Sequence, residues 1–346
     1  MSLYQWVTQE RAGRQLEDIA PGLSGSRRMT FQLNRGGMVS GEMDANHPLC
    51  RKDLGLEEGV HELVVYRDGV PLETVFRLCE PDIGATTDAA TVGFQWQGIQ
   101  SYFQDALVLA QASAYSGTTL PWTWINTFQA RTGGAYSVTQ GAQTGTAPTR
   151  TKQVQQDAGL MDAIIQLSEA NNGFDFGIDA ARRWNEWHTQ RGSDRGVHLE
   201  LGVNIAEVGW KKNAGPGELV SDLWVHGPPG SASVVASDTA ARTKYGRRES
   251  SLGFFADMEA VAVSTGQLQG YANSIIDDRV KPLAIPKLRL ERDALEWGSY
   301  WLGDTVHVVA EIGNYDRLDG KYRIVQIDVD VDENDNEKIS LGVNAL

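Results

Sequence analysis

Polar and apolar residues alternate with a period of two near both ends of the chain. Residues 29–48 form two such runs around Arg35-Gly36-Gly37, and residues 322–343 form two more around a short turn. Side chains two positions apart lie on one face of a strand, and glycine-rich breaks mark turns or bulges. The pattern therefore predicts one pair of strands near each end of the chain.

Further strands are predicted beside these two pairs. Residues 61–66 and 72–78 flank Asp68-Gly69, a dipeptide typical of hairpin turns. Near the C-terminus, residues 287–291 and 306–310 alternate in the same way, and Leu318-Asp319-Gly320 is interpreted as a turn. The N-terminal strands form a meander that can close into a small barrel or half-barrel and is expected to end at residue 82.

The middle of the chain has helical spacing instead. Apolar residues recur at steps of three and four in residues 99–114, after Pro121, from Asp157 to residue 170, and in residues 265–280 before Pro282. Residues 174–178 alternate as a half-buried strand, and residues 132–152 are interpreted as a mobile loop or weak hairpin. The predicted fold class is α+β, mainly β, with β-domains flanking an α/β middle region. The expected domains are 1–82 (β), 83–156 (helical, with the loop), 157–235 (α/β) and 236–346 (a helix and a β-domain).

The composition is that of a globular chain. Hydrophobic residues make up 41% of the 346 residues and charged residues 22%. No apolar run approaches the ~20 residues that span a bilayer, and the first residues do not resemble a secretory signal. We therefore expect synthesis in the cytoplasm and no membrane insertion. The net charge of −14 is spread along the chain, which disfavours a surface that grips nucleic acid.

The sequence shows no recognisable catalytic or metal-binding motif. Cys50 and Cys79 lack the further ligands of a zinc site and are expected to be unlinked, partly buried thiols. The six histidines form no HExxH or other recognised ligand pair, so each is expected at the surface or in a turn; they are His47, His61, His188, His198, His226 and His307. No GxSxG, Walker or dinucleotide fingerprint is present. We therefore expect no catalytic residues, no cofactor and no bound metal.

Asp328, Asp330 and Asp332 alternate with apolar residues near the C-terminus. Their spacing is similar to the start of a calcium loop, but the glycine and the final glutamate of that loop are missing in either register. A solvated or lumen-facing side of a strand is the better interpretation.

Ten tryptophans are a high count for this length. Trp122, Trp124, Trp184 and Trp187 lie in the middle region. Exposed tryptophans can stack on sugars, so a carbohydrate-binding role stays open, although tryptophan is also enriched in cores and at protein interfaces. The core and interface interpretation is favoured.

Several segments together resemble one family of proteins. They are RGGMVSGEMDANHP at residues 35–48, LMDAIIQLSEANNGFDFGID at 160–179, ELVSDLWVHG at 218–227, and LGDTVHVVAEIGNYDRLDGKYRIVQIDVDVDENDNEKISLGV at 302–343. Their content and order are similar to the tail hub, also called baseplate hub or minor tail protein, of long-tailed siphovirus-type bacteriophages, especially those of actinobacteria. The resemblance covers most of the chain, but not residues 132–152 or 180–196.

The resemblance implies an assembly role at the tip of the virion tail. It implies that the first and last domains are tube-like β-barrels and that a homotrimer forms a pseudo-sixfold ring continuing the tail tube. The implied partners are the distal tail protein, the tape-measure protein and other minor tail proteins, while genomic DNA passes through without specific binding. In this interpretation Asp328, Asp330 and Asp332 are candidates for lining the channel. A receptor- or carbohydrate-binding minor tail protein is the alternative, and a peptidoglycan hydrolase is less favoured.

Overall fold

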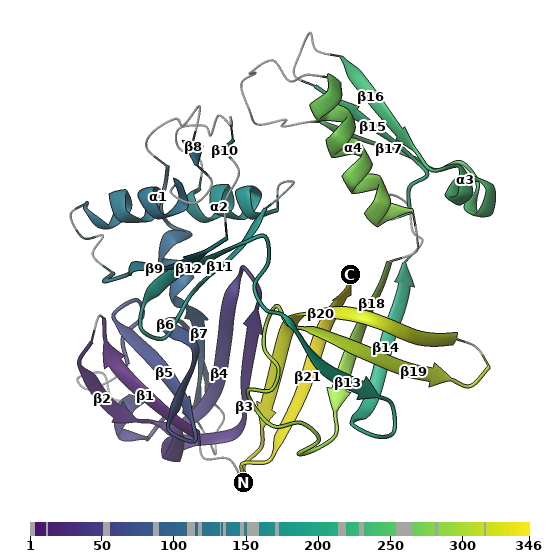
Figure 1. Cartoon of the computed structure of the whole chain (residues 1–346). Helices are drawn as coiled ribbons and strands as arrows, with labels where there is room; N and C mark the ends of the chain where they lie inside the picture. Colours follow the sequence, from purple (N-terminus) through teal and green to yellow (C-terminus); the bar gives the residue numbers. More distant parts are fainter. Residues whose placement is uncertain are drawn as a thin grey trace.

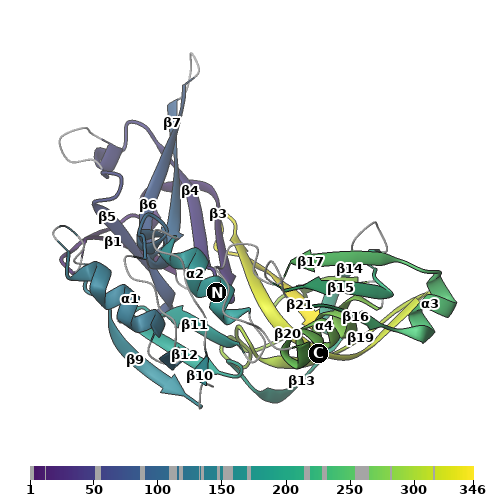
Figure 2. The same cartoon turned by 90° about the horizontal axis from the view of Figure 1, so that it is seen from above.

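A large sheet and two smaller α/β units make up the chain in a computed structural model (Figure 1). The structure describes residues 4–11, 13–50, 56–85, 90–108, 115–116, 120–131, 133, 136–145, 149–150, 159–169, 173–213, 219–227, 232–253, 265–280, 283–314 and 316–346. Figure 2 shows one unit beside the N-terminal strands and the other beside the C-terminal strands.

Strands from both ends of the chain build the large sheet. Its thirteen strands are β1 (Tyr4–Glu10), β2 (Gln15–Asp18), β3 (Leu23–Gln32), β4 (Gly36–Asp44), β5 (His61–Arg67), β6 (Val70–Ala85), β7 (Ala90–Gly98), β13 (Asp194–Glu200), β14 (Ile205–Asn213), β18 (Leu283–Leu290), β19 (Thr305–Ile312), β20 (Asp316–Val331) and β21 (Glu337–Ala345). Their order is β14-β18-β21-β20-β3-β4-β7-β6-β5-β1-β2, with β19 on β20 and β13 on β19. One hydrophobic core lies against this sheet and includes Trp6, Phe31, Trp96 and Ile327.

Strand β20 joins the N-terminal and C-terminal strands into one sheet. Residues 316–323 pair with β19, residues 326–331 pair with β3, and β21 pairs with residues 322–331. Because β20 and β4 occupy the two sides of β3, the N-terminal meander does not close on itself through β3. The expectation of two β-barrel domains is therefore corrected: the described strands of the two chain ends form one open sheet, without a closed barrel.

The middle unit packs against β5 and β6 of the large sheet. It contains η3 (Ile99–Phe103), β8 (Tyr115–Ser116), α1 (Leu120–Gln129), β9 (Thr139–Thr144), β10 (Thr149–Arg150), α2 (Leu160–Ser168), β11 (Phe174–Ile178) and β12 (Arg183–His188). The sheet order is β11-β12-β9, and both helices lie over it in Figure 1. Ile125 of α1, Ile164 of α2 and Phe176 of β11 share one core, which explains the apolar spacing of these segments.

The third unit pairs a three-stranded sheet with one long helix. Its elements are β15 (Asp222–His226), β16 (Ser233–Ser237), α3 (Thr239–Tyr245), β17 (Glu249–Gly253) and α4 (Thr265–Arg279). Leu268, Ala272 and Ile276 of α4 pack against β15 and β16, as their helical spacing predicts. Two short 3-10 helices, η1 (Ala20–Gly22) and η2 (Pro48–Cys50), complete the described elements.

Several predicted boundaries differ from the structure. Residue 82 lies within β6 and residue 235 within β16, and the division into domains stays a prediction. Residues 99–114 form only the short helix η3 in their described part, and Asp157 lies outside the described residues. The expected loop at 132–152 contains β9, which pairs with β12. Leu318-Asp319-Gly320 lies inside β20, and the chain turns instead at Gly313, whose φ is +49°.

None of the helices in the described part of the chain has both the length and the apolar character needed to cross a membrane.

The packing of β20 gives a first testable prediction. Val329 is 0% exposed and faces the shared core, whereas Val70 on β6 is 65% exposed. We expect Val329→Ala to lower the free energy of unfolding by about 1.6 kcal/mol or more, because two buried methyl groups are lost and a cavity remains. Val70→Ala, the matched control, is expected to change it by less than about 0.5 kcal/mol. Urea unfolding followed by circular dichroism measures both, and equal losses would contradict the assigned core.

Candidate functional site

One face of the large sheet is polar over six neighbouring strands, from β18 through β21, β20, β3 and β4 to β7. Thr30, Asp328 and Ser340 lie opposite one another on β3, β20 and β21, and Arg28, Asp330 and Lys338 form the next row on this face. The intervening residues, including Phe31, Ile327 and Leu341, are buried in the core. This alternation, visible in the sequence, produces a broad polar surface beside the junction of the two chain ends.

Asp328 is a buried member of this face. It is 2% exposed, and its carboxylate accepts hydrogen bonds from Thr30 Oγ1 at 2.8 Å and from Gln326 Nε2 at 2.9 Å. Lys287 Nζ on β18 lies 3.3 Å from its other oxygen. Asp328 therefore links β20 to β3 through a hydrogen bond and also contacts the Lys287 side chain of β18.

Asp330 and Asp332 have different surroundings. Asp330 is about half exposed, with Arg28 Nε 3.8 Å from its carboxylate. Asp332 lies in the β20–β21 turn, where it accepts hydrogen bonds from the side chain and backbone of Asn336 and from the backbone of Asn334; these bonds lower the pKa of Asp332. The structure thus brings Asp328 and Asp330 to one face and places Asp332 beyond it.

The charges on this face are mixed. Asp328 and Asp330 share it with four basic side chains from three neighbouring strands, namely Arg28, Lys287, Arg289 and Lys338. Lys287 and Arg28 pair with the two aspartates. The aspartate pattern seen in the sequence therefore belongs to a surface of opposite charges and not to a uniformly acidic one.

A buried ion pair connects the middle unit to this sheet. Arg323 of β20 bonds to Asp175 of β11, and Arg323 Nη2 also donates to the Arg191 carbonyl at 3.0 Å. Asn34, in the β3–β4 turn with a φ of +62°, donates to Asp175 at 3.0 Å and accepts from the Phe176 amide at 2.8 Å. The two chain ends and the middle unit thus meet at one carboxylate that is 4% exposed.

A second carboxylate, Glu73 of β6, extends this joint. Arg191 forms a two-pronged ion pair with Glu73, and Trp301 Nε1 donates to the same carboxylate. The Arg191 guanidinium also lies 4.7 Å from the centre of the Trp187 ring. Because the partners are separated by 118 and 228 residues, no local sequence pattern marks them.

Glu62 of β5 anchors the other side of the middle unit. It is 0% exposed and is bonded by Arg182, by Gln9 Nε2 at 3.0 Å and by Tyr102 Oη at 3.1 Å. Burial and the neighbouring carboxylate raise the pKa of Tyr102. The carboxylate is thus satisfied by three side chains, and the sheet and the middle unit are held together at two points.

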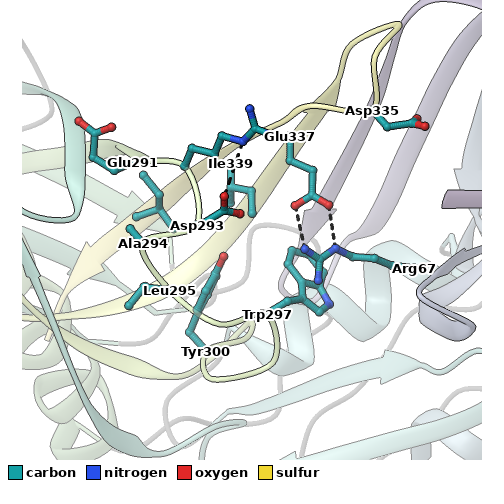
Figure 3. A pocket seen from close by; sticks show the side chains of 12 residues that line it. Arg67, Glu291, Asp293, Ala294, Leu295, Trp297, Tyr300, Asp335, Glu337 and Ile339 are labelled. Atoms are coloured by element: carbon teal, nitrogen blue, oxygen red, sulfur yellow. Dashed lines mark hydrogen bonds and ion pairs between the residues drawn. The ribbon is translucent and has the colours of Figure 1, made fainter. Parts of the chain in front are cut away.

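A shallow recess lies where β5 approaches the β20–β21 hairpin (Figure 3). Arg67 binds Glu337 through two hydrogen bonds of 2.9 Å and stacks 4.6 Å from the centre of the Trp297 ring. Tyr300 lies beside them, and charged residues from the 291–293 segment rim the recess. Arg67 and Glu337 pair with each other across the recess, which makes it a further contact between the chain ends.

The tryptophans of the middle region are mostly packed inside it. Trp184 is 0% exposed and Trp124 6%, while Trp122 and Trp187 are half-buried. These four side chains therefore do not form an exposed platform for sugars. Cys50 and Cys79 are unlinked and partly buried, which confirms that prediction. Within the described residues, no group of three or more His, Cys, Asp and Glu side chains is arranged to hold a metal ion.

Glu186 of β12 is an unusual carboxyl group. It is 0% exposed, Trp184 Nε1 donates to it at 2.6 Å, and His188 Nε2 lies 3.3 Å from its other oxygen. Burial raises the pKa of Glu186 from 4.5 to about 7. Its protonation therefore changes near neutral pH, within the core of the middle unit.

Comparisons with known proteins identify the fold. No protein-family model matches the chain, and no curated protein matches it either. Among solved structures, the 43 kDa tail protein of prophage MuSo2 from Shewanella oneidensis has a TM-score of 0.69 at 13% identity, covering 99% of this chain and 98% of that one. A tail protein from Neisseria meningitidis MC58 has a TM-score of 0.67 at 10% identity, covering 99% of this chain and 96% of that one. Prophage tail protein gp18 from Listeria monocytogenes EGD-e has a TM-score of 0.60 at 12% identity, covering 99% of this chain and 95% of that one. The chain therefore has a fold found in phage tail proteins.

The buried joint gives a second prediction. Arg323→Ala leaves the Asp175 carboxylate buried without its guanidinium, so we expect a loss of about 3–5 kcal/mol in the free energy of unfolding. Arg317→Ala, on the same strand but 58% exposed, serves as the control and should cost no more than about 1 kcal/mol. Chemical unfolding measures both variants. A small effect of Arg323→Ala would show that this joint does not stabilise the chain.

Glu186 gives a third prediction, for pH dependence. Because its pKa is raised in the folded state, the contribution of Glu186 to stability is fully present below pH 4.5 and is lost as the pH rises through about 7. Glu186→Gln should flatten the stability profile between about pH 5 and 8, by an amount on the order of 3 kcal/mol. Glu169→Gln, at an exposed position in the same unit, should leave the profile unchanged. Urea unfolding at a series of pH values tests this, and an unchanged Glu186→Gln profile would contradict it.

Proposed function

We propose that this chain is a structural hub protein at the tip of a bacteriophage tail. The observation that supports it is the agreement in fold with phage tail proteins along nearly the whole chain, at 99% coverage of this chain and 98% of the MuSo2 protein. The fold also matches, at a TM-score of 0.52 and 10% identity, an E. coli type VI secretion component described as structurally similar to the T4 tail proteins gp27 and gp5. The role is one of assembly and not of catalysis.

The proposed assembly is a homotrimeric ring that continues the tail tube. Each chain supplies an N-terminal and a C-terminal group of strands, joined through β3 and β20, so three chains supply six such groups. The middle and third units lie to the side of this sheet, where they are available for neighbouring tail proteins (Figures 1 and 2). The finer identity we propose is a siphovirus-type hub of the kind found in actinobacteriophages, with distal tail, tape-measure and minor tail proteins as partners.

The polar face is proposed to line the DNA channel. Asp330 is a half-exposed acidic residue of this face. Asp328 is buried within the face, and Asp332 lies beyond it in the β20–β21 turn. Arg28 and Lys287 are paired with carboxylates, which limits their capacity to bind phosphate. DNA is thus expected to pass this surface without specific binding. Three chains would carry three times the −14 charge of one, which also opposes adhesion.

The trimer is tested with the purified full chain. Mass photometry is expected to show a particle of three times the 37.9 kDa chain mass, either alone or after addition of the cognate distal tail protein. A reconstructed tail tip should show three copies around the axis, with the face carrying Asp330 turned toward the channel. A chain that stays monomeric in both settings would refute the ring, and an Asp330 on the outer wall would refute the channel assignment.

A further inference from the structure

Two histidines from distant parts of the sequence meet on the surface of the large sheet. His198 of β13 and His307 of β19 are direct partners in a parallel strand pair. Their Nδ1 atoms lie 3.2 Å apart, and the two ring planes make an angle of 73°. The side chains are 50% and 41% exposed, so solvent and dissolved ions reach them.

Carboxylates lie on the far side of both rings. Asp319 Oδ1 is 2.9 Å from His307 Nε2, and Glu200 Oε2 is 3.9 Å from His198 Nε2. The Asp319 carboxylate at Nε2 of His307 favours the tautomer with its proton there, which leaves the Nδ1 lone pair of His307 available. At 3.2 Å the two Nδ1 atoms can share one proton in a hydrogen bond, or both lone pairs can bind one metal ion.

The distance between the two nitrogens suits a metal ion. Zinc–imidazole bonds of about 2.0–2.1 Å at a tetrahedral angle place two nitrogens about 3.3 Å apart. The Asp319–His307 contact also has the form of a carboxylate that orients a metal-binding histidine. The two histidines therefore supply two metal ligands, and Asp319 orients one of them, His307.

The surrounding charges favour a cation. Three acidic side chains lie at or beside the pair, Glu200, Asp319 and Asp194, and the basic neighbours are Lys321, the cross-strand partner of His307, and Arg317. Lys321 is engaged by Asp194 at 2.7 Å, and Arg317 by Asp319 at 2.8 Å and Glu311 at 3.3 Å. The local excess of negative charge attracts a divalent cation.

We propose that His198 and His307 hold a divalent transition-metal ion through their Nδ1 atoms. Imidazole donors select zinc, nickel or copper over magnesium and calcium. The remaining coordination positions face solvent, where water completes the site in the isolated chain. The ion links the strand β13, which pairs only with β19 among the described strands, to the body of the sheet. This site is independent of the proposed tail function.

The test is isothermal titration calorimetry of the full chain with zinc chloride near neutral pH. We expect saturable binding of one ion per chain, reversed by a chelator and lost in His198→Gln and in His307→Gln. Asp319→Asn should weaken binding by about 10–100-fold, because it removes the carboxylate that orients the ring. His226→Gln, an exposed histidine of the third unit, is the matched control and should bind zinc like the unmodified chain.

A second measurement does not depend on the variants folding. Electron paramagnetic resonance of the unmodified chain with one equivalent of copper(II) should show coupling to two imidazole nitrogens. A signal without imidazole nitrogen, or zinc uptake that persists in both histidine variants, would overturn the proposal. Absence of zinc binding together with a single shared proton, seen by NMR titration of the two rings, would also overturn it.

Discussion

The pairing of β3 with β20 is the constraint on which the rest of the structure depends. It joins residues almost 300 positions apart, through six aligned residue pairs from Gln32–Gln326 to Arg27–Val331. Phe31, Met29, Ile327 and Val329 lie in one core across this seam. Loop closure over such a distance is entropically unfavourable, and the seam must offset it by burying apolar area along both strands. The open sheet, the polar face and the joints to the middle unit all require this alignment.

The buried carboxylates define how the middle unit sits on that sheet. Asp175 and Glu73 each receive donors from two or three separate parts of the chain, and Glu62 does so on the other side. Buried ion pairs add less net stability than their Coulomb attraction suggests, because both charges lose water. Their geometry is nevertheless selective: a rotated middle unit would leave these charges buried without partners. The joints therefore favour one arrangement of the middle unit on the sheet.

Local patterns in the sequence predicted those parts of the fold that depend on local periodicity. The hairpins around residues 35–37 and 68–69 and the helix at 265–279 follow from alternation and spacing alone. The prediction of β-barrels was wrong because closure of a barrel depends on which distant strand pairs with the free side of β3. The turn at Leu318-Asp319-Gly320 was wrong because β20 continues through it, supported by β19. Channel lining by Asp328, Asp330 and Asp332 stays a prediction, although the structure now distinguishes their surroundings.

The His198–His307 pair shows that local sequence patterns also fail to predict a site formed by residues far apart in the chain. Neither histidine belongs to a recognisable ligand motif, since 109 residues separate them and only the parallel pairing of β13 with β19 brings them together. Conversely, the aspartates with a conspicuous spacing are bound within the chain by Thr30, Arg28 and Asn336. Regular spacing along one strand reports which face a residue occupies, whereas ligand geometry requires donors from different strands. In a sheet assembled from distant segments, chemistry is therefore expected at cross-strand positions that the sequence does not mark.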